Sequence, residues 1–339
     1  MKSPIHGGSR LLAAPDKFRG SLSAADAAHA IADGAVRAGW SAHELPLADG
    51  GEGTLDVLGG GNRSSVVTGP LRRPVQACWR LADGIAVVEM AKASGLLLVG
   101  GCEGNDPVAA TTRGTGELIA EALDRGAECV LVAVGGSATS DGGLGAVEVL
   151  RDLAPFDVPV RVACDVETRF VDAAAAYGPQ KGAGPAEVEI LTARLHELVA
   201  RYRDEFGVDV SLVRGGGAAG GLAGGLAALG AELVPGFELV ASAVGLDAAL
   251  DGVDGVVTGE GLVDSTSFSG KVVGGVIARA AERGVRAFIV AGGVTPGVVL
   301  PVPTVSLLDR FGAGLAWRDP EEAVARAVAA TLAELAVPV

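Results

Sequence analysis

Short apolar runs alternate with helical patterns along most of this chain, and this alternation restricts the fold more than any other feature. The runs expected to form strands are Arg10–Pro15, Ile85–Met90, Val130–Val134, Val160–Cys164, Gly255–Thr258, Ala287–Ala291 and Pro303–Leu308. The Ala- and Leu-rich stretches expected to form helices are Ala24–Ala38, Gly116–Arg125, Pro185–Phe206, Lys271–Arg283 and Pro320–Leu335. Because strand–helix alternation is typical of parallel α/β units, the sequence predicts an α/β protein.

The segment Ser64–Met90 departs from this alternation, because it reads as β-hairpins with turn signals at Gly-Pro and Ala-Asp-Gly. It predicts a smaller mixed-sheet domain inserted into the first, and 339 residues suffice for about two domains. We assign residues 1–60, 115–150 and 250–339 to the first domain, and residues 61–114 and 151–249 to the inserted one. Gly215–Gly230 reads as a helix-like run of small residues.

Composition excludes several classes of protein. Apolar residues make up 49% of the chain, which argues against disorder, and the 52 glycines follow no collagen-like period. A net charge of −14 opposes binding to nucleic acids and to anionic membranes. Neither a signal-peptide pattern nor a window of about 20 apolar residues occurs, so we expect a soluble cytoplasmic protein. Three of the four cysteines lie in or beside apolar runs, where we expect small buried thiols, and none of the four has a CxxC spacing.

Several predicted strands end in charged or Gly-rich loops, which is where ligands bind in open α/β sheets. The loop in Leu131–Gly145, LVAVGGSATSDGGLG, consists of backbone, hydroxyls and one carboxylate. Its amides and hydroxyls suit an anion, and its carboxylate suits a cation. The other such loops are in LLAAPDKFRGS, VACDV, VVTGEGLVDSTS and IVAGG. These loops predict one site at the carboxyl edge of the sheet.

The lysines are unusually placed. Only five of the 27 basic residues are lysines, and apart from the terminal Lys2 all lie beside Gly or Ser in motif-like stretches. Since the chain otherwise uses arginine, a retained lysine suggests a need for a compact point charge, with chance placement as the alternative. The four lysines in question are Lys17, Lys92, Lys181 and Lys271.

The polar set as a whole suits phosphoryl transfer, which needs positioning, a metal ion and positive charge more than a covalent nucleophile. Asp49 and Glu52 lie in the flexible stretch ADGGEGT, and TTRGTGEL places Arg113 before a helix whose amides favour an anion. For each acid alone, turn chemistry is the simpler interpretation. No GxxxxGK[ST] motif occurs, and the one GxGxxG match, at residues 215–220, lies in a run so rich in glycine that it carries little weight.

Eight motifs occur in an order that closely resembles the type I glycerate kinase family over about residues 11–295. They are APDKFRGSLSA, LADGGEGT, VEMAKASGL, TTRGTGELI, VGGSATSDGGLGAVEVL, ACDV with GPQKGA, GGGAAGGLAGGL with GAELVPG, and TGEGLVDSTSFSGK. The resemblance implies two α/β domains, one Rossmann-like and one inserted, with the active site in the cleft between them. It also implies phosphorylation of D-glycerate with ATP and Mg²⁺.

The residue pattern and the resemblance together provide the site candidates. The expected catalytic residues are Asp16, Asp165, Asp264 and Lys271. The three carboxylates would accept the substrate proton or hold the metal, and the lysine would bind carboxylate or phosphate. The residues expected to bind substrate or phosphate are Lys17, Arg19, Ser21, Asp49, Glu52, Gly135, Gly136, Ser137, Thr139, Gln180, Lys181 and Glu260. The expected Mg²⁺ ligands are Asp141 and Asp165. The chain departs from the family pattern at Lys17 and Arg19, where a serine and then a lysine are expected, and it is shorter around Leu58–Asn62.

Alternatives remain open at this point. The expected product is 2-phosphoglycerate, with 3-phosphoglycerate as the alternative. Other readings are a kinase of a different small hydroxy acid, a non-catalytic cleft protein that binds a small anion, and, third, a dehydrogenase. The anion receptor is disfavoured because it gains nothing from acids such as Asp141, Asp165 and Asp264 beside its ligand. The sequence does not distinguish a monomer from a dimer.

Overall fold

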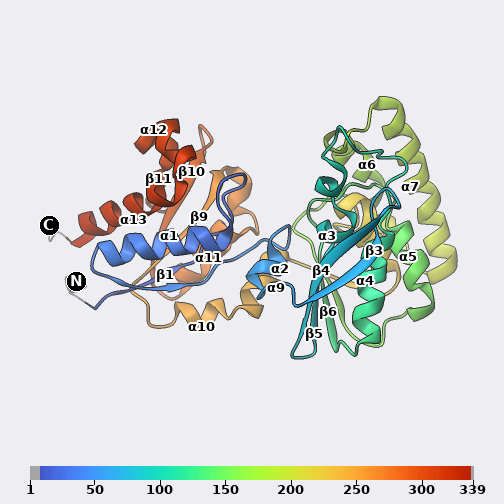
Figure 1. Cartoon of the computed structure of the whole chain (residues 1–339), viewed down its shortest axis with the longest axis horizontal. Coiled ribbons are helices and arrows are strands. Elements are labelled where there is room, and N and C mark those ends of the chain that lie inside the picture. The colour runs from blue at the N-terminus through green and yellow to red at the C-terminus, as the bar shows by residue number, and fades with distance from the viewer. Residues whose placement is uncertain (1–7, 337–339) are drawn as a thin grey trace. The chain divides into compact units, whose positions relative to one another are not determined.

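The computed structural model describes residues 8–336, so Lys2 lies outside the described residues. The chain divides into two compact units (Figure 1). Unit 1 comprises Met1–Asp49 and Phe237–Val339, and unit 2 is the continuous segment Gly50–Gly236. The second unit is thus one continuous insertion into the first.

The domain boundaries differ from those expected. Residues 115–150 were assigned to the first domain, but strand β6 (Cys129–Ala133) pairs on both sides with strands of unit 2. Residues 50–60 also belong to unit 2, and residues 237–249 to unit 1. A run such as CVLVA is equally suited to the parallel strands of either sheet, so only strand pairing decides its place.

Unit 1 contains a five-stranded sheet in the order β11-β10-β9-β1-β2, and all its pairs are parallel. Its strands are β1 (Arg10–Ala13), β2 (Ser41–Glu44), β9 (Gly255–Val263), β10 (Arg286–Val294) and β11 (Thr304–Ser306). The central strand β9 has Val256 opposite Leu12 on one side and Ala287 on the other. Strand β2, with the sequence SAHE, is polar and largely exposed, and for that reason apolar runs did not reveal it.

Helices cover both faces of this sheet. Figure 1 shows α1 (Ala24–Arg37) and α13 (Pro320–Ala336) side by side, and Ile31 and Val328 join a core with Leu11 of β1. Their close approach needs Gly34, because a Cβ there would lie 2.4 Å from the Ala325 carbonyl oxygen. On the other face, α11 (Val272–Glu282) packs through Val273 on the β10 side chains. The remaining α-helices of this unit are α9 (Gly236–Ala243), which begins at the boundary, α10 (Leu246–Leu250) and α12 (Leu307–Arg318).

Unit 2 contains a six-stranded mixed sheet in the order β3-β4-β5-β6-β7-β8. The hairpin strands β3 (Arg63–Thr68), β4 (Pro74–Ala82) and β5 (Ile85–Glu89) are antiparallel neighbours, which confirms the hairpins predicted for Ser64–Met90. Strands β5, β6, β7 (Val160–Ala163) and β8 (Glu232–Val234) are parallel. The register Val88–Val132–Val162 places one apolar row across the core face.

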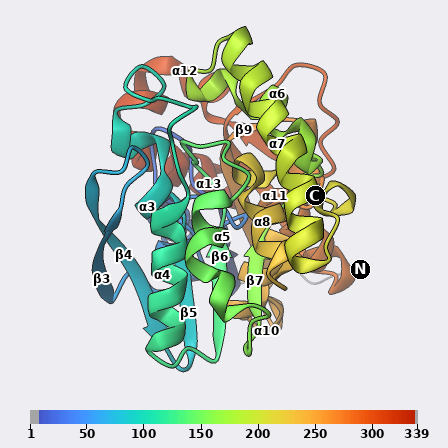
Figure 2. The ribbon, with the colours of Figure 1, turned by 90° about the vertical axis from the view of Figure 1, so that its right-hand side faces the viewer.

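Helices α4 (Arg113–Asp124) and α5 (Leu144–Leu150) lie side by side over strands β5 and β6, as Figure 2 shows. Helix α7 (Pro185–Phe206) has the predicted bounds: Pro185 starts it after Gly184, and left-handed Gly207 ends it. The predicted helix Gly215–Gly230 is interrupted, because Ala219 and Gly220 have positive φ angles before α8 (Leu222–Ala228) begins. The other helices are α2 (Thr54–Val57), α3 (Ala91–Ser94) and α6 (Ala173–Tyr177).

The prediction of buried thiols is wrong, because none of the four cysteines is buried. Cys78 and Cys102 are exposed, whereas Cys129 and Cys164 are partly exposed, and each is a free cysteine. Cys78 shows the reason, because it lies on an amphipathic strand whose neighbours Ala77 and Trp79 are buried. An apolar run does not reveal which of its alternating positions face the core.

Candidate functional site

The carboxyl ends of the parallel strands carry most of the predicted polar residues in each unit. In unit 1, Asp16 follows β1, and Glu260 lies within the carboxyl-terminal half of β9. In unit 2, Glu89 ends β5, Gly135 follows β6 and Asp165 follows β7. Parallel pairing brings these strand ends to one edge of each sheet. The sequence predicted a single edge, but β1 and β9 belong to the sheet of unit 1, whereas β6 and β7 belong to the sheet of unit 2.

Asp16, Asp49 and Glu260 form the carboxylate cluster of unit 1. Asp16 is buried: its amide donates to the Gly259 carbonyl at 2.9 Å, and its Oδ1 accepts from the Lys17 amide at 2.7 Å. Burial raises the pKa of Asp16 to about 7, and the negative charge of Asp49 adds to the rise, while the Lys17 amide opposes it. A carboxyl that titrates near neutrality can accept or release a proton at physiological pH.

Burial also raises the pKa of Glu260. The hydrogen bond from Ser267 and the positive charge of Lys271 partly oppose this rise. Its Oε1 is buried and accepts no hydrogen bond from the part of the chain that the structure describes. Such an orphaned carboxylate oxygen is uncommon in folded proteins and suits an external donor or a cation.

Asp264 caps the short helix η7 (Ser265–Phe268). Its Oδ1 accepts from the Thr266 amide and hydroxyl, both at 2.7 Å, and these bonds lower the pKa of Asp264. Lys271 Nζ donates to the Thr266 hydroxyl at 3.1 Å. Asp264 therefore organises the turn beside Lys271. This capping role is enough to explain an aspartate at this position without a catalytic role.

Arg19 and Ser21 lie on the loop after β1. The Ser21 hydroxyl donates to the Phe18 carbonyl at 3.2 Å. Both residues line a mainly apolar pocket of about 310 Å³, together with Leu262 and the exposed Trp317. This loop thus joins the carboxylate cluster to an apolar pocket within unit 1.

The glycine loop after β6 is held by close backbone contacts in unit 2. A Cβ on Gly135 would lie 2.7 Å from the Glu52 nitrogen, so only glycine allows the ADGGEGT stretch to approach. Gly136 has a φ of 69°, and its carbonyl accepts from the Leu96 amide at 2.9 Å. Ser137 is buried in the segment that follows. The loop is therefore preorganised, and it brings Glu52 next to the two glycines.

Asp141 is an anchor of this loop. Its Oδ2 accepts from the Thr112 amide at 2.8 Å, the Thr112 hydroxyl at 2.9 Å and the Gly145 amide at 3.2 Å. Its Oδ1 accepts from the Gly143 amide at 3.0 Å. These bonds tie the loop to the start of α4 and α5. Among residues 8–336, no group of three or more His, Cys, Asp or Glu side chains is arranged to hold a metal ion.

Lys181 contacts the same loop through its buried side chain. It is 2% exposed, and its Nζ donates to the Thr139 carbonyl at 2.6 Å. Burial lowers the pKa of Lys181 to about 7, while the negative charge of Asp141 acts in the opposite direction. The Thr139 hydroxyl in turn donates to the Ala110 carbonyl at 2.9 Å. The Lys181 ammonium is directed at the protein backbone, whereas its neighbour Gln180 is exposed.

Asp165 and Glu89 connect further segments to the strand edge. Asp165 Oδ1 accepts from the Gly236 amide at 2.7 Å. Sequence analysis missed Glu89, which is fully buried, with Oε2 accepting from the Gly53 and Leu55 amides at 3.1 and 3.2 Å. Burial raises the pKa of Glu89, which the Leu55 amide partly opposes. The available signal was an acid at the end of the apolar run IAVVEM.

These features define a two-unit α/β protein with carboxylates, lysines and glycine loops at the ends of parallel strands, a set typical of phosphoryl-transfer enzymes. The model of the glycerate kinase family matches residues 11–154 and 150–329. The chain belongs to the glycerate kinase family, which confirms the resemblance found in its motifs. No helix within residues 8–336 is long and apolar enough to span a membrane.

Individual relatives support this membership. The glycerate 2-kinase of Escherichia coli K12 is 38% identical over 330 residues, which cover 85% of this chain and 86% of that protein. The glycerate kinase of Halalkalibacterium halodurans is 38% identical over 328 residues, with coverage of 85% and 86%. The crystal structure of a glycerate kinase 2 from Salmonella typhimurium LT2 superposes with a TM-score of 0.82 at 34% identity, covering 97% of this chain and 98% of that one.

Proposed function

We propose that this chain phosphorylates D-glycerate with ATP as the donor and releases 2-phosphoglycerate and ADP. The observation that carries the proposal is its similarity, over 85% of its length, to a protein named glycerate 2-kinase. Membership in a kinase family supports ATP as the phosphate donor. The substrate hydroxyl oxygen attacks the γ-phosphorus, the bond to the bridging oxygen of ADP breaks, and the hydroxyl proton leaves.

Asp16 is the residue that accepts this proton. Its pKa of about 7 supports the role, because a base works best when its pKa lies near the operating pH. Lys17 and Lys271 provide positive charge in unit 1. In unit 2, the backbone of Gly135 and Gly136 and the Ser137 hydroxyl contact phosphate oxygens, as glycine loops before helices often do.

Mg²⁺, when bound, neutralises charge on the transferred phosphoryl group. Glu260 fits a Mg²⁺ ligand, because its buried Oε1 lacks a hydrogen-bond partner among the described residues. Protein sites for Mg²⁺ commonly supply one or two carboxylates and leave the other positions to water and phosphate oxygens. Asp165 is the second candidate. Asp141 is a weaker candidate than the sequence suggested, because its oxygens already accept four hydrogen bonds.

Purified protein tests the activity directly. With ATP, Mg²⁺ and a panel of hydroxy acids, we expect ADP release with D-glycerate and none without the metal. Phosphorus NMR of the product distinguishes the 2-phosphate from the 3-phosphate. Preference for another hydroxy acid would replace the substrate assignment, and no glycerate-dependent ADP release would refute the proposal.

Variants test the residue roles. Asp16→Asn should retain the fold and lose about 10²- to 10⁴-fold in turnover, the usual range for lost acid–base assistance. Asp204→Asn is the matched control, since Asp204 is an exposed carboxylate on α7. Asp264→Asn separates chemistry from capping, because near-normal turnover would limit that residue to the turn it organises.

A further inference from the structure

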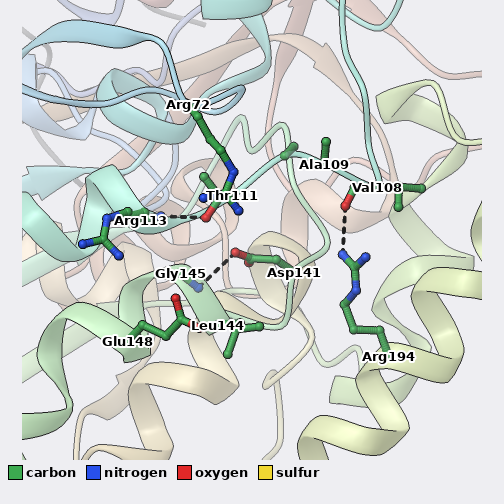
Figure 3. A pocket seen from close by; sticks show the side chains of 11 residues that line it. Arg72, Val108, Ala109, Thr111, Arg113, Asp141, Leu144, Gly145, Glu148 and Arg194 are labelled. Carbon is green, nitrogen blue, oxygen red and sulfur yellow. Dashed lines mark hydrogen bonds between the residues drawn. The ribbon is translucent and has the colours of Figure 1, made fainter.

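Apart from Asp141, no residue that lines a pocket of about 380 Å³ in unit 2 has a role in the proposed reaction. This pocket lies where the β3–β4 turn, the loop before α4, the start of α5 and one face of α7 meet (Figure 3). Its polar lining includes Arg72, Thr111, Asp141, Glu148 and Arg194. Figure 3 shows Arg72 and Arg194 reaching inward from different elements of the fold.

Arg72 is held in a costly backbone conformation. Its φ of 63° is in the left-handed region, which glycine adopts easily and a long side chain rarely does. The turn is fixed by the bond from the Arg72 amide to the Gly69 carbonyl at 3.0 Å, and by the bond from the Thr111 amide to the Pro70 carbonyl at 2.9 Å. A strained non-glycine residue at the edge of a pocket indicates that its side chain has a function there.

The guanidinium of Arg72 has no hydrogen-bond or ion-pair partner within residues 8–336. Arg194 is half-buried, and its NH1 donates to the Val108 carbonyl at 2.9 Å, which leaves its other N–H groups for a ligand. Arg113 also lines the pocket, but its Nε donates to Glu117 at 3.1 Å. Two guanidinium groups therefore offer donors suited to phosphate oxygens.

The carboxylates in the lining do not cancel this charge. Asp141 is engaged by four hydrogen-bond donors, and the buried Lys181 ammonium is close enough for its pKa to respond to the Asp141 charge. Glu148 is exposed on α5, away from Arg72 in Figure 3. The inner part of the pocket is thus favourable to an anion, and Glu148 reduces the attraction.

We propose that this pocket binds the phosphoryl group of a small phosphorylated ligand, with Arg72 and Arg194 as the main donors and the Thr111 hydroxyl beside them. The volume exceeds that of a phosphate ion and suits a small metabolite or part of a nucleotide. The sequence predicted an anion site in the loop preceding α4, and this proposal identifies the anion as a phosphoryl group. The inference does not depend on the proposed kinase activity.

Calorimetric titration of the full chain with inorganic phosphate tests the pocket. We expect saturable binding that weakens with added NaCl, and an affinity about 10- to 100-fold lower in Arg72→Gly, the usual effect of losing a hydrogen bond to a charged group. Glycine suits the left-handed turn, so the variant should melt at the same temperature or higher. Arg73→Ala, one residue further along the exposed turn, should bind phosphate as the parent does.

Glu148→Gln provides a test of opposite sign, because removing a negative charge from the lining should tighten phosphate binding. Repeating the titration with a non-hydrolysable ATP analogue identifies the source of the phosphoryl group. If the analogue and phosphate compete, the phosphoryl group in this pocket belongs to the nucleotide. If both bind at once, it belongs to a separate metabolite. Either result supports a phosphoryl site in this pocket. Absence of saturable phosphate binding, or unchanged affinity in Arg72→Gly, would overturn the inference.

Discussion

Asp16→Asn should stabilise the ligand-free protein at alkaline pH while reducing its activity. The carboxyl is buried beside Asp49 and Glu260, and its pKa in the folded chain is about 7, against an ordinary value of 3.8. At about 1.4 kcal/mol per pKa unit, this difference corresponds to about 4 kcal/mol. Asparagine has nearly the same shape as aspartate and keeps a side-chain oxygen that can accept the hydrogen bond from the Lys17 amide.

The direction of the pH dependence follows from proton binding. Below about pH 4, Asp16 is protonated in both the folded and the unfolded chain, so it affects stability little. Between about pH 4 and 7, the unfolded chain loses this proton while the folded chain keeps it, so the stability of the parent protein falls as pH rises. Asp16→Asn escapes this loss, and its advantage should grow from about 2 kcal/mol at pH 5 to about 4 kcal/mol at pH 8.

Differential scanning calorimetry in a chelating, ligand-free buffer measures this advantage as a rise in melting temperature. Asp204→Asn controls for the loss of one negative charge, and its effect should be small at both pH values. If the stability advantage of Asp16→Asn is the same at pH 5 and pH 8, or if the variant is less stable than the parent at pH 8, then burial does not disfavour the charged form of Asp16. A stabilised but slow variant would mark a residue kept for function at a cost in stability.

Three further predictions concern other residues. Lys271→Ala should lower turnover by about 10²- to 10³-fold and Lys92→Ala by little, as steady-state kinetics will show, and equal losses would remove Lys271 from the site. Because the buried Lys181 has a pKa of about 7, its charged form destabilises the folded parent protein at pH 6 more than at pH 9. The free energy of unfolding of Lys181→Met minus that of the parent should therefore be about 3 kcal/mol higher at pH 6 than at pH 9. Chemical denaturation at the two pH values measures this difference, and equal values would show that burial does not disfavour the charge of Lys181. Gly135→Ala should reduce both turnover and melting temperature, because its Cβ would meet the Glu52 nitrogen at 2.7 Å, whereas Gly314→Ala has open space and should be tolerated.

The local elements of this protein could be predicted from the sequence because each depends on residues close together in the chain. The bounds of α7 agree with Pro185–Phe206, since a proline start and a glycine stop are local signals. The strand ends that carry Asp16 and Gly135 were also found, because an apolar run followed by polar residues needs no distant partner. Motif order likewise identified the family.

Tertiary structure decided the features that depend on distant partners. Strand pairing placed β6 in unit 2, although its composition suits either sheet. The lysine pattern marked Lys181, but only packing shows that its ammonium is buried against the Thr139 carbonyl. The backbone angle of Arg72 and the burial of Glu89 have no local signature of comparable strength. Burial and pairing are set by residues far away in the chain, so periodicity and spacing cannot specify them.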